Sequence, residues 1–485
     1  MPRRRLQLPV TGDGAELRAG FDQVRTELQV QSEFAPDVVA AASAAAGAPR
    51  LPDLDLTDIA FATLDPPGSR DLDQAYAIER VATTGGYRVR YAIADVAAFV
   101  QAGGVVDAEA QRRVETLYAP DRRTPLYPPV LSEGAASLLP GQVRPALVWT
   151  LELDRDGQLT SIEVRRAVVR SREQQDYPAV QAQLDAGTAP EPVALMREVG
   201  LLRLARQRDR GGMSLAVPTQ EVVPDGDGWR LELRASLPVE DWNAQLSLLT
   251  GIAAATLMLD GHVGVLRTMP PADPRDVSRL RRVAHGLGID WAADESYGTV
   301  LDRVQGRPPA DHDRVEAFET EAASLFRGAA YTAFDGAPPV RTTHAAIAAP
   351  YAHCTAPLRR LVDRYAGEVC LALCAGVDVP AWARSELPAL PETMARGDQR
   401  AHALDRAMVD LVEAVVLQPS VGQTFDAVVV DIDEHRGGGT VALTSPAVLA
   451  RCEATRGPLP LGEPLRVRLL EADVARRVVR FVPAG

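Results

Sequence analysis

The sequence contains no lysine, so all 52 of its basic side chains are arginines. Part of this bias reflects genomic composition, and arginine abundance as such is weak evidence for phosphate recognition. Only clustered arginines are informative here. The 65 acidic residues give a net charge of −13, which taken alone argues against nucleic-acid binding. Because net charge is summed over the whole molecule, an internal channel can still be basic.

Cysteine and long apolar runs are also scarce. No CxxC pair or zinc-ligand spacing occurs among the four cysteines, Cys354, Cys370, Cys374 and Cys452, which we interpret as buried, reduced thiols. The longest apolar runs, such as residues 251–259, are too short to cross a bilayer. The first residues, MPRRRLQLPV, lead into polar sequence instead of the apolar core of a signal peptide. We therefore expect a cytoplasmic protein without a membrane segment.

The composition is otherwise that of a globular protein of two or three domains, with 485 residues, 46% hydrophobic and 24% charged. Strand patterns begin near residue 57, and helical patterns follow at 239–259, 312–334 and 394–417. Short strands with Gly and Pro turns fill the last section, a pattern typical of an OB-type barrel. We expect an α+β fold in four parts, namely a helical segment with a linker (1–56), a main domain (57–395), a connecting helix (396–419) and the barrel (420–485).

The stretch LDPPGSRDLDQA (64–75) concentrates Asp65, Asp71 and Asp73 around a Pro-Pro-Gly turn, with Arg70 as its one cation. We expect a buried strand to end at Asp65, and Asp71 and Asp73 to enter the next strand. Residues two apart in a strand share a face, so these two carboxylates would lie about 7 Å apart. Clustered carboxylates suit Mg²⁺ or Mn²⁺. A solvated Asp-rich turn is an equally weighted alternative, and DxD sequences also occur in metal-dependent glycosyltransferases.

A second stretch, residues 351–373, has apolar residues at helical spacing and two adjacent arginines near its start. Thr355 is a favourable N-cap, which would place Arg359 and Arg360 in the opening turns of the helix. Free backbone N–H groups and the helix dipole favour anions there, and a guanidinium can hold a phosphate through two hydrogen bonds. The alternative is an ordinary helix surface with an ion pair between Arg359 and Asp363.

Together these stretches resemble the ribonuclease II/ribonuclease R family, the RNB-type exoribonucleases. The resemblance covers about 420 residues and rests on four motifs in the family's order: DPPGSRDLDQA (65–75), YAIADVAAFV (91–100), LYAPDRRTPLYPPVLSEGAASLLP (117–140) and YAHCTAPLRR (351–360). It implies an RNB-type catalytic domain, with a mixed curved sheet flanked by helices around an RNA channel, followed by the OB-type barrel. The implied reaction is hydrolysis of single-stranded RNA from its 3′ end to nucleoside 5′-monophosphates, with Mg²⁺ or Mn²⁺ as the cofactor.

The resemblance also assigns residues. The metal ligands would be Asp65, Asp71, Asp73 and Gln74, and the catalytic residues would be Asp73 and Arg359. The residues expected to contact RNA are Tyr118, Tyr177, Tyr351, His353, Arg359 and Arg360. Tyrosine stacking suits a nuclease without base preference, because every base has a π-face. A tyrosine packed in the core is the alternative for these rings. We expect the protein to act as a monomer on RNA.

Two departures from the family pattern bear on activity. Gln74 stands where the family has a fourth acid, so an RNA-binding protein of the same fold with weakened catalysis is the main alternative to an exoribonuclease. A DxD-type transferase is less favoured, because it explains neither the arginine pair nor the terminal barrel. Residues 1–56 are too few and too helical for the family's two cold-shock barrels. We therefore expect the channel and the C-terminal barrel to hold RNA, with weaker or less processive binding.

Overall fold

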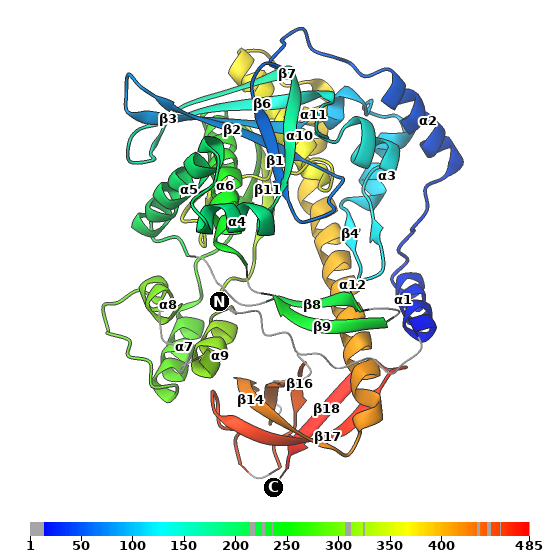
Figure 1. Cartoon of the computed structure of the whole chain (residues 1–485), viewed down its shortest axis with the longest axis vertical. Helices are drawn as coiled ribbons and strands as arrows, with labels where there is room; N and C mark the ends of the chain where they lie inside the picture. Colours follow the sequence, from blue (N-terminus) through cyan, green and yellow to red (C-terminus); the bar gives the residue numbers. More distant parts are fainter. Residues whose placement is uncertain are drawn as a thin grey trace.

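The structure is a computed structural model that describes residues 14–213, 219–225, 228–234, 236–305, 312–323, 325–433, 437–443, 448–455 and 457–484. These residues form two bodies that one long helix connects (Figure 1). The upper body contains a closed barrel and most of the helices, and the lower body contains a second closed barrel at the C-terminal end. Helix α12 (Leu390–Leu417) runs from one to the other, which confirms the helical pattern at 394–417.

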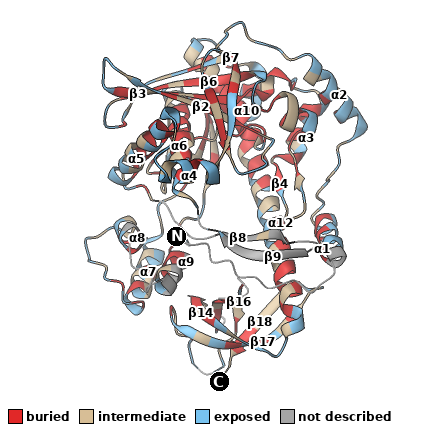
Figure 2. Ribbon diagram, viewed as in Figure 1, coloured by how far each residue is buried: buried red, intermediate tan, exposed pale blue. Residues whose placement is uncertain are grey.

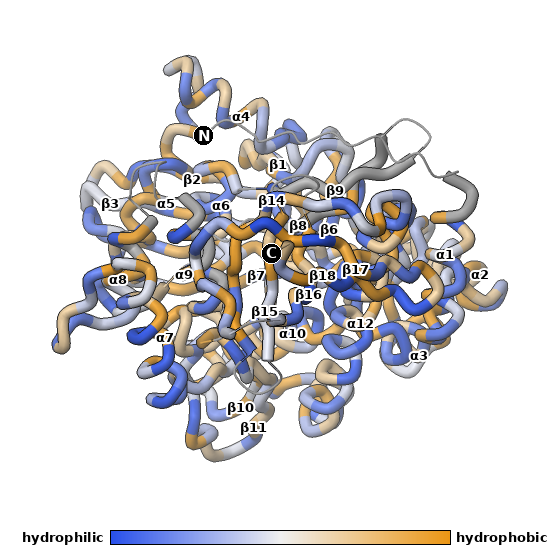
Figure 3. Tube along the Cα trace, turned by 90° about the horizontal axis from the view of Figure 1, so that it is seen from below, coloured by the Kyte–Doolittle hydropathy of each residue, from blue (hydrophilic) through white to orange (hydrophobic). Residues whose placement is uncertain are grey.

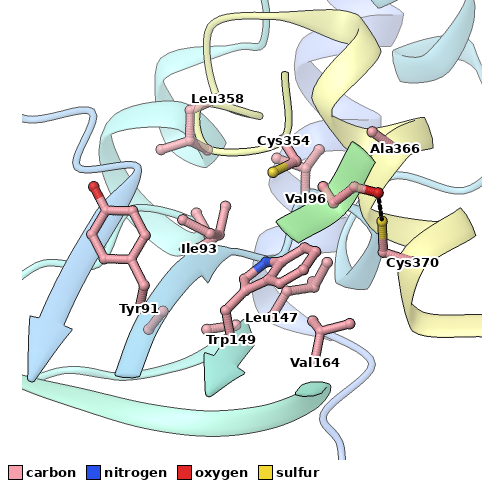
Figure 4. Packing of buried hydrophobic residues seen from close by; sticks show 14 of the residues in the cluster. Tyr91, Ile93, Val96, Leu147, Trp149, Val164, Cys354, Leu358, Ala366 and Cys370 are labelled. Carbon is pink, nitrogen blue, oxygen red and sulfur yellow. Dashed lines mark hydrogen bonds between the residues drawn. The ribbon is translucent and has the colours of Figure 1, made fainter. Parts of the chain in front are cut away.

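The barrel of the upper body, called the large barrel below, orders the strands β1 (Phe61–Asp65), β2 (Gln74–Val81), β3 (Gly86–Ala94), β6 (Val143–Leu153) and β7 (Leu159–Asp176). Strand β1 pairs with β7 in parallel, and the other neighbours are antiparallel. The sheet is therefore mixed, as predicted, and the structure adds that it closes on itself. Trp149 on β6 is completely buried in the main core (Figure 4).

Helices pack around the large barrel and share its core: α2 (Pro36–Gly47), α3 (Val105–Arg113), α4 (Tyr177–Asp185), α5 (Glu191–Asp209), α6 (Pro238–Asp260), α10 (Leu361–Ala375) and α11 (Ala381–Glu386). Figure 2 shows buried residues concentrated where these helices meet the strands. Among the described residues, α6 is the one helix long and apolar enough to cross a membrane. In its most apolar window 61% of the residues are buried, as in a core helix.

Four two-stranded sheets complete the upper and middle parts: β4 (Leu117–Tyr118) with β5 (Arg123–Thr124), β8 (Thr219–Asp225) with β9 (Gly228–Arg234), β10 (Val263–Thr268) with β11 (Ala330–Asp335), and β12 (Thr343–His344) with β13 (Ala349–Pro350). Helices α7 (Pro274–Gly286), α8 (Tyr297–Gln305) and α9 (His312–Ala323) have a small core of their own. These three helices lie beside the lower body in Figure 1.

The helix predicted over 312–334 is wrong in its second half. Helix α9 ends at Ala323, and the chain then forms strand β11. Gly328 adopts a φ of +82°, a left-handed conformation that interrupts a right-handed helix. Tyr331 and Phe334 beyond it are residue types that favour strands.

The second barrel, called the C-terminal barrel below, consists of β14 (Thr424–Ile432), β15 (Gly439–Leu443), β16 (Leu449–Cys452), β17 (Pro464–Asp473) and β18 (Val478–Pro483). It confirms the predicted OB-type barrel. In the view from below, its strands gather around the C-terminus (Figure 3). Helix α1 (Gly14–Glu27) packs against α12, and its Leu17 and Phe21 belong to the same apolar cluster as Leu411 on α12 and Phe481 on β18.

The arginine-bearing helix begins later than predicted. Helix α10 starts at Leu361, and Arg360 before it has an extended backbone, with φ −134° and ψ 126°. Arg360 pairs with Glu115 in a strand-like bridge, and Leu361 N–H donates to the Val114 carbonyl at 3.0 Å. This tertiary pairing overrides helical propensity, so Thr355 is not the N-cap, and neither arginine lies in an opening turn.

Candidate active site

Asp65 is the last residue of β1, as predicted, and the turn after it contains Gly68 at a φ of +80°, which favours glycine. Its Oδ2 atom is buried and has no hydrogen-bond partner among the described residues. The pKa of this carboxyl is raised to about 7, first by burial and then by the charge of Asp71, while Arg359 opposes the rise. A buried carboxylate oxygen without a partner is unfavourable, so this atom is suited to receive a cation.

Asp71 lies between β1 and β2, where it accepts a hydrogen bond from the guanidinium of Arg123 on β5. The prediction that Asp71 and Asp73 share one face of a strand is wrong, because β2 begins after both of them. The backbone N–H of Leu72, between them, donates instead to the Ser137 hydroxyl at 2.9 Å. The carboxylates of Asp71 and Asp73 therefore lie on an irregular segment between β1 and β2, and each has a partner from a distant part of the chain.

Asp73 is 4% exposed. Its Oδ1 atom accepts a hydrogen bond from the Leu358 N–H at 2.7 Å, and its Oδ2 atom lies 3.5 Å from Arg359 Nε. Burial raises the pKa of this carboxyl to about 8, while Arg359 and the Leu358 N–H act in the opposite direction. Asp73 and Arg359, the two residues expected to be catalytic, are thus in contact.

Residues 355–360, called the arginine loop below, are anchored by the buried carboxylate of Asp363. Its Oδ1 atom accepts hydrogen bonds from the Ala356 N–H and from Arg360 Nη2, both at 2.7 Å. Its Oδ2 atom accepts one from Arg360 Nε at 2.9 Å. Asp363 therefore pairs with Arg360 and not with Arg359, whose side chain is 45% exposed. This arrangement holds the backbone and leaves the Arg359 guanidinium open to a ligand.

Gln74 is the first residue of β2 and contacts the same loop. Its Nε2 atom donates a hydrogen bond to the Thr355 carbonyl at 2.6 Å, and its Oε1 atom accepts one from the Tyr91 hydroxyl at 2.7 Å. Ser247 Oγ on α6 lies 2.9 Å from the same hydroxyl. Both ends of the carboxamide are thus hydrogen-bonded within the protein. Its assignment as a metal ligand stays a prediction.

Tyr118 and Tyr177 lie around the acids. Tyr118 is 53% exposed, yet burial of its hydroxyl is the main cause that raises its pKa to about 12, and the charge of Arg359 opposes this rise. Tyr177 opens helix α4, and its hydroxyl accepts a hydrogen bond from Asn243 at 3.1 Å. Burial raises the pKa of Tyr177 to about 12, the bond from Asn243 lowers it, and the charge of Asp65 raises it.

Tyr351 and His353 belong to a packed aromatic cluster ahead of the arginine loop. Tyr351 is 8% exposed, and its ring meets the His353 ring edge-on at 5.4 Å. The Tyr331 hydroxyl lies 2.7 Å from His353 Nδ1, and Arg267 stacks over the Tyr331 ring at 4.4 Å. Burial lowers the pKa of His353 well below its usual value, so this imidazole is neutral. These contacts favour a packing role, and RNA contact by either residue stays a prediction.

Within the described ranges, no three Asp, Glu, His or Cys side chains are close enough to enclose a metal ion as they stand. The residues nevertheless fit a hard divalent cation. Asp65 presents an unpartnered buried oxygen, Asp71 is near enough to raise the pKa of Asp65, and Asp73 completes a donor set made only of carboxylate oxygens.

Sequence reasoning missed three contributors. Arg123 lies five residues after Tyr118 in the third motif, but nothing in that spacing indicates that it pairs with Asp71. Asp363 was weighed only as a partner of Arg359, although the i,i+3 spacing to Arg360 is also favourable. Tyr91 was an ordinary residue of a predicted strand.

Comparison with known protein families gives two matches that together cover most of the chain. Residues 54–372 match the RNB domain, and residues 423–484 match the RNase II-type exonuclease C-terminal S1 domain. The first match contains every predicted site residue, and the second coincides with the C-terminal barrel.

Individual relatives agree with these matches. The chain is 24% identical to ribonuclease R of Thermotoga maritima over 95% of its own length and 69% of that protein. It is 28% identical to the exosome complex exonuclease dis3 of Schizosaccharomyces pombe over 64% of its own length, and it spans 33% of that protein. The chain therefore corresponds to only about a third of the larger relative.

Solved structures show the same architecture. The apo form of Mycoplasma genitalium RNase R superimposes with a TM-score of 0.84 over 96% of this chain and 78% of that one, at 19% identity. The same protein has also been solved with ribose methylated single-stranded RNA and with double-stranded RNA. These comparisons confirm the family resemblance and the fold class expected from the sequence.

Proposed function

The chain belongs to the RNB family of exoribonucleases, and from this premise we propose that it hydrolyses single-stranded RNA from the 3′ end to nucleoside 5′-monophosphates with a divalent metal ion. One observation carries the proposal. Asp65 at the end of β1 and Asp71 and Asp73 after it lie near one another, and a separate segment of chain brings the exposed Arg359 to within 3.5 Å of Asp73. This pairing of an acidic cluster with a solvent-open guanidinium is what phosphodiester hydrolysis requires.

The metal ion, Mg²⁺ or Mn²⁺, would be held by Asp65, Asp71 and Asp73. When bound, it would supply Lewis-acid activation of the water and of the scissile phosphate. The protein positions the carboxylates that would bind this ion. The Leu358 N–H fixes one oxygen of Asp73, and Arg123 fixes Asp71, so neither carboxylate is free to drift.

Arg359 would donate hydrogen bonds to the oxygens of the scissile phosphate. Its guanidinium is 45% exposed and lies 3.5 Å from Asp73, so a phosphate bound beside Asp73 can reach it. The negative charge that develops during hydrolysis is stabilised best by donors already in place. Asp363 contributes to that preorganisation by bonding the backbone N–H of Ala356 before Arg359 and the guanidinium of Arg360 after it.

Binding of the RNA is assigned to the two tyrosines and to the C-terminal barrel. Tyr118 is exposed on β4, and the hydroxyl of Tyr177 is held by Asn243, so both rings are suited to stack on bases near the 3′ end. The C-terminal barrel would contact the strand further from the cut. We place this activity in the cytoplasm and expect the protein to act as a monomer.

The alternative is an RNA-binding protein of the same fold with weakened catalysis, which the neutral Gln74 favours. Family membership offers no support for a transferase. To separate the two remaining functions, the protein is incubated with 5′-labelled single-stranded RNA and Mg²⁺. We expect labelled products that shorten progressively, together with nucleoside 5′-monophosphates, and no products when a chelator removes the metal. Retained RNA binding without any products at saturating Mg²⁺ would favour the binding protein.

A further inference from the structure

We propose that Gln74 is a positioning residue, which ties the strand behind the acids to the arginine loop, and that it does not ligate the metal. The inference rests on the proposed function, because its role is to place Arg359. It starts from the hydrogen bonds of the carboxamide. Its Nε2 donates to the Thr355 carbonyl at 2.6 Å, and its Oε1 accepts from the Tyr91 hydroxyl at 2.7 Å and, more weakly, from Ser247 Oγ at 3.5 Å.

The bond to Thr355 requires an N–H donor. Thr355 is 4% exposed, and its carbonyl can only accept a hydrogen bond. Glutamine supplies the donor through Nε2, whereas an ionised Asp or Glu side chain would set one acceptor against another in a buried place. Glutamine, which stands at position 74 in place of the family's acid, is therefore a residue type that can make this hydrogen bond.

The bond from Tyr91 orients the carboxamide. Gln74 pairs with Ile93 across strands β2 and β3, which makes Tyr91, two residues earlier, a diagonal neighbour on the same face. Tyr91 is 1% exposed, and Figure 4 shows its hydroxyl directed away from the Trp149 side of the core. The Thr355 carbonyl can only accept a hydrogen bond, so the NH₂ group of the Gln74 carboxamide points toward it. The carboxamide oxygen then faces Tyr91, and only one orientation of the amide satisfies both contacts.

The tie to Gln74 completes the support of the arginine loop. Gln74 holds the loop at Thr355, Asp363 holds it at Ala356, and Asp73 holds it at Leu358. In Figure 4 the segment that carries Cys354 and Leu358 lies over Ile93 of the sheet. Arg359 follows directly, so a shift at the start of the loop displaces the guanidinium that would meet the phosphate.

The same contacts argue against metal ligation. To coordinate an ion, the carboxamide oxygen must turn away from Tyr91, and the turn also breaks the bond to the buried Thr355 carbonyl. The buried Thr355 carbonyl would then lose its partner, and the Tyr91 hydroxyl would keep only Ser247 Oγ at 2.9 Å, which is unfavourable. Three carboxylates remain as the donors at the site.

The test compares Gln74→Met with wild type in steady-state hydrolysis of one single-stranded RNA. Methionine keeps the length and removes the donor and the acceptor. We expect kcat to fall about ten-fold or more, with KM for RNA and the Mg²⁺ concentration for half-maximal rate within about two-fold of wild type. Tyr91→Phe should lower kcat less, and the double variant should lose less than the product of the two single losses, because both act through one tie.

The matched control is Tyr76→Phe. Tyr76 is the cross-strand partner of Tyr91, is 2% exposed, and donates a hydrogen bond of the same kind, to Gln175 Oε1 at 2.8 Å. That bond does not reach the arginine loop. We expect kcat of this variant to stay within about two-fold of wild type, which separates loss of the tie from loss of any buried tyrosine hydroxyl.

Gln74→Glu distinguishes the two roles of residue 74. If the residue positions the loop, the carboxylate cannot donate to Thr355, and kcat falls as in Gln74→Met without a lower Mg²⁺ requirement. A lower Mg²⁺ requirement with kcat retained would overturn the proposal and identify a metal ligand, as would wild-type kcat in Gln74→Met. Should Gln74→Met fail to fold, Gln74→Glu and Tyr91→Phe carry the test.

Hydrogen exchange tests the tie independently of activity. Amides of residues 355–360 should exchange faster in Gln74→Met than in wild type, and at the wild-type rate in Tyr76→Phe. If the wild-type protein does not hydrolyse RNA, the proposed function fails while this measurement still decides the tie. Equal exchange in all three proteins would overturn it.

Discussion

Among the described residues the two barrels have five strands each, but they differ in the charged groups that accompany them. Around the large barrel, charged groups are buried: Asp73 at its acid segment, and Asp95, which pairs with Arg166 at 2.6 Å. No charged side chain is buried on the described strands of either barrel, and beside the C-terminal barrel the buried Glu413 of α12 accepts a hydrogen bond from the Leu449 N–H on β16 at 3.1 Å. The ion pairs on the strands of the C-terminal barrel are partly to largely exposed, from Arg480 with Glu471 to Arg466 with Asp426.

This difference bears on how charged groups affect the stability of each barrel. Buried charges require desolvation, and the large barrel offsets that cost with the main apolar core around Trp149. Exposed pairs contribute little to stability and stay available for phosphates. We therefore expect substitutions in the large barrel to change the chemical step or the fold, and those in the C-terminal barrel to change binding. The predictions below test that division.

The largest effect is expected at Asp73. Asp73→Asn keeps the shape and the acceptor for the Leu358 N–H but removes the charge, so hydrolysis should slow by about 10²-fold or more while RNA binding is retained. Single-turnover rates and a binding titration on the same RNA measure the two quantities. Unchanged turnover would remove Asp73 from the chemistry.

Arg359→Lys comes next. Lysine keeps the charge but loses the planar fork, so kcat should fall about 10²-fold, with little change in affinity for long RNA. Steady-state kinetics and filter binding provide the comparison. A collapse of affinity with kcat intact would instead make Arg359 a binding residue, and the division between the barrels would fail.

The neighbouring substitution Arg360→Lys is the control for Arg359→Lys. From the structure we expect it to affect stability more than catalysis. Arg360 holds Asp363 through two guanidinium nitrogens, so the substitution should lower the free energy of unfolding by about 1–3 kcal/mol. Denaturant unfolding measures this loss, and kcat per folded molecule should change less than in Arg359→Lys. Sequence reasoning alone predicted an arginine that contacts RNA.

The smallest effect is expected in the C-terminal barrel. Arg466→Ala removes a largely exposed arginine, so affinity for long RNA should fall by less than about ten-fold and the salt dependence should lose up to about one unit of slope. Titrations at several salt concentrations measure this, and kcat should not change. A substitution is preferable to removal of the barrel, because truncation would expose Leu17 and Phe21 of α1. Loss of kcat in the folded Arg466→Ala protein would contradict the division.

The sequence predicts the parts of this molecule that depend on local pattern. The end of β1 at Asp65, helix α6 and the C-terminal barrel follow from apolar periodicity and turn residues. The start of α10 does not, because a strand-like bridge between Arg360 and Glu115, distant in the chain, decides it. Motif order identified Asp73 and Arg359 for the same site, and their contact at 3.5 Å agrees with that assignment.

What the sequence does not predict are pairings between separate segments. Gln74 meets Thr355 across 281 residues, and Arg123 meets Asp71 across 52. No periodicity contains that information, since it depends on how the large barrel closes. The role of Gln74 therefore becomes visible only in three dimensions, whereas its departure from the family acid was visible at once.

Helix α1 has a further consequence, for the order in which the chain is made. Its apolar residues pack with α12 and the C-terminal barrel, and Arg477 near the end of the chain pairs with Glu27, 450 residues earlier. Arg25 also reaches Asp121, in the turn between β4 and β5, through two bonds of 2.7 and 2.8 Å. Helix α1 is therefore synthesised long before the barrel with which it packs. Until that barrel has been made, the apolar face of α1 is available to chaperones or to aggregation.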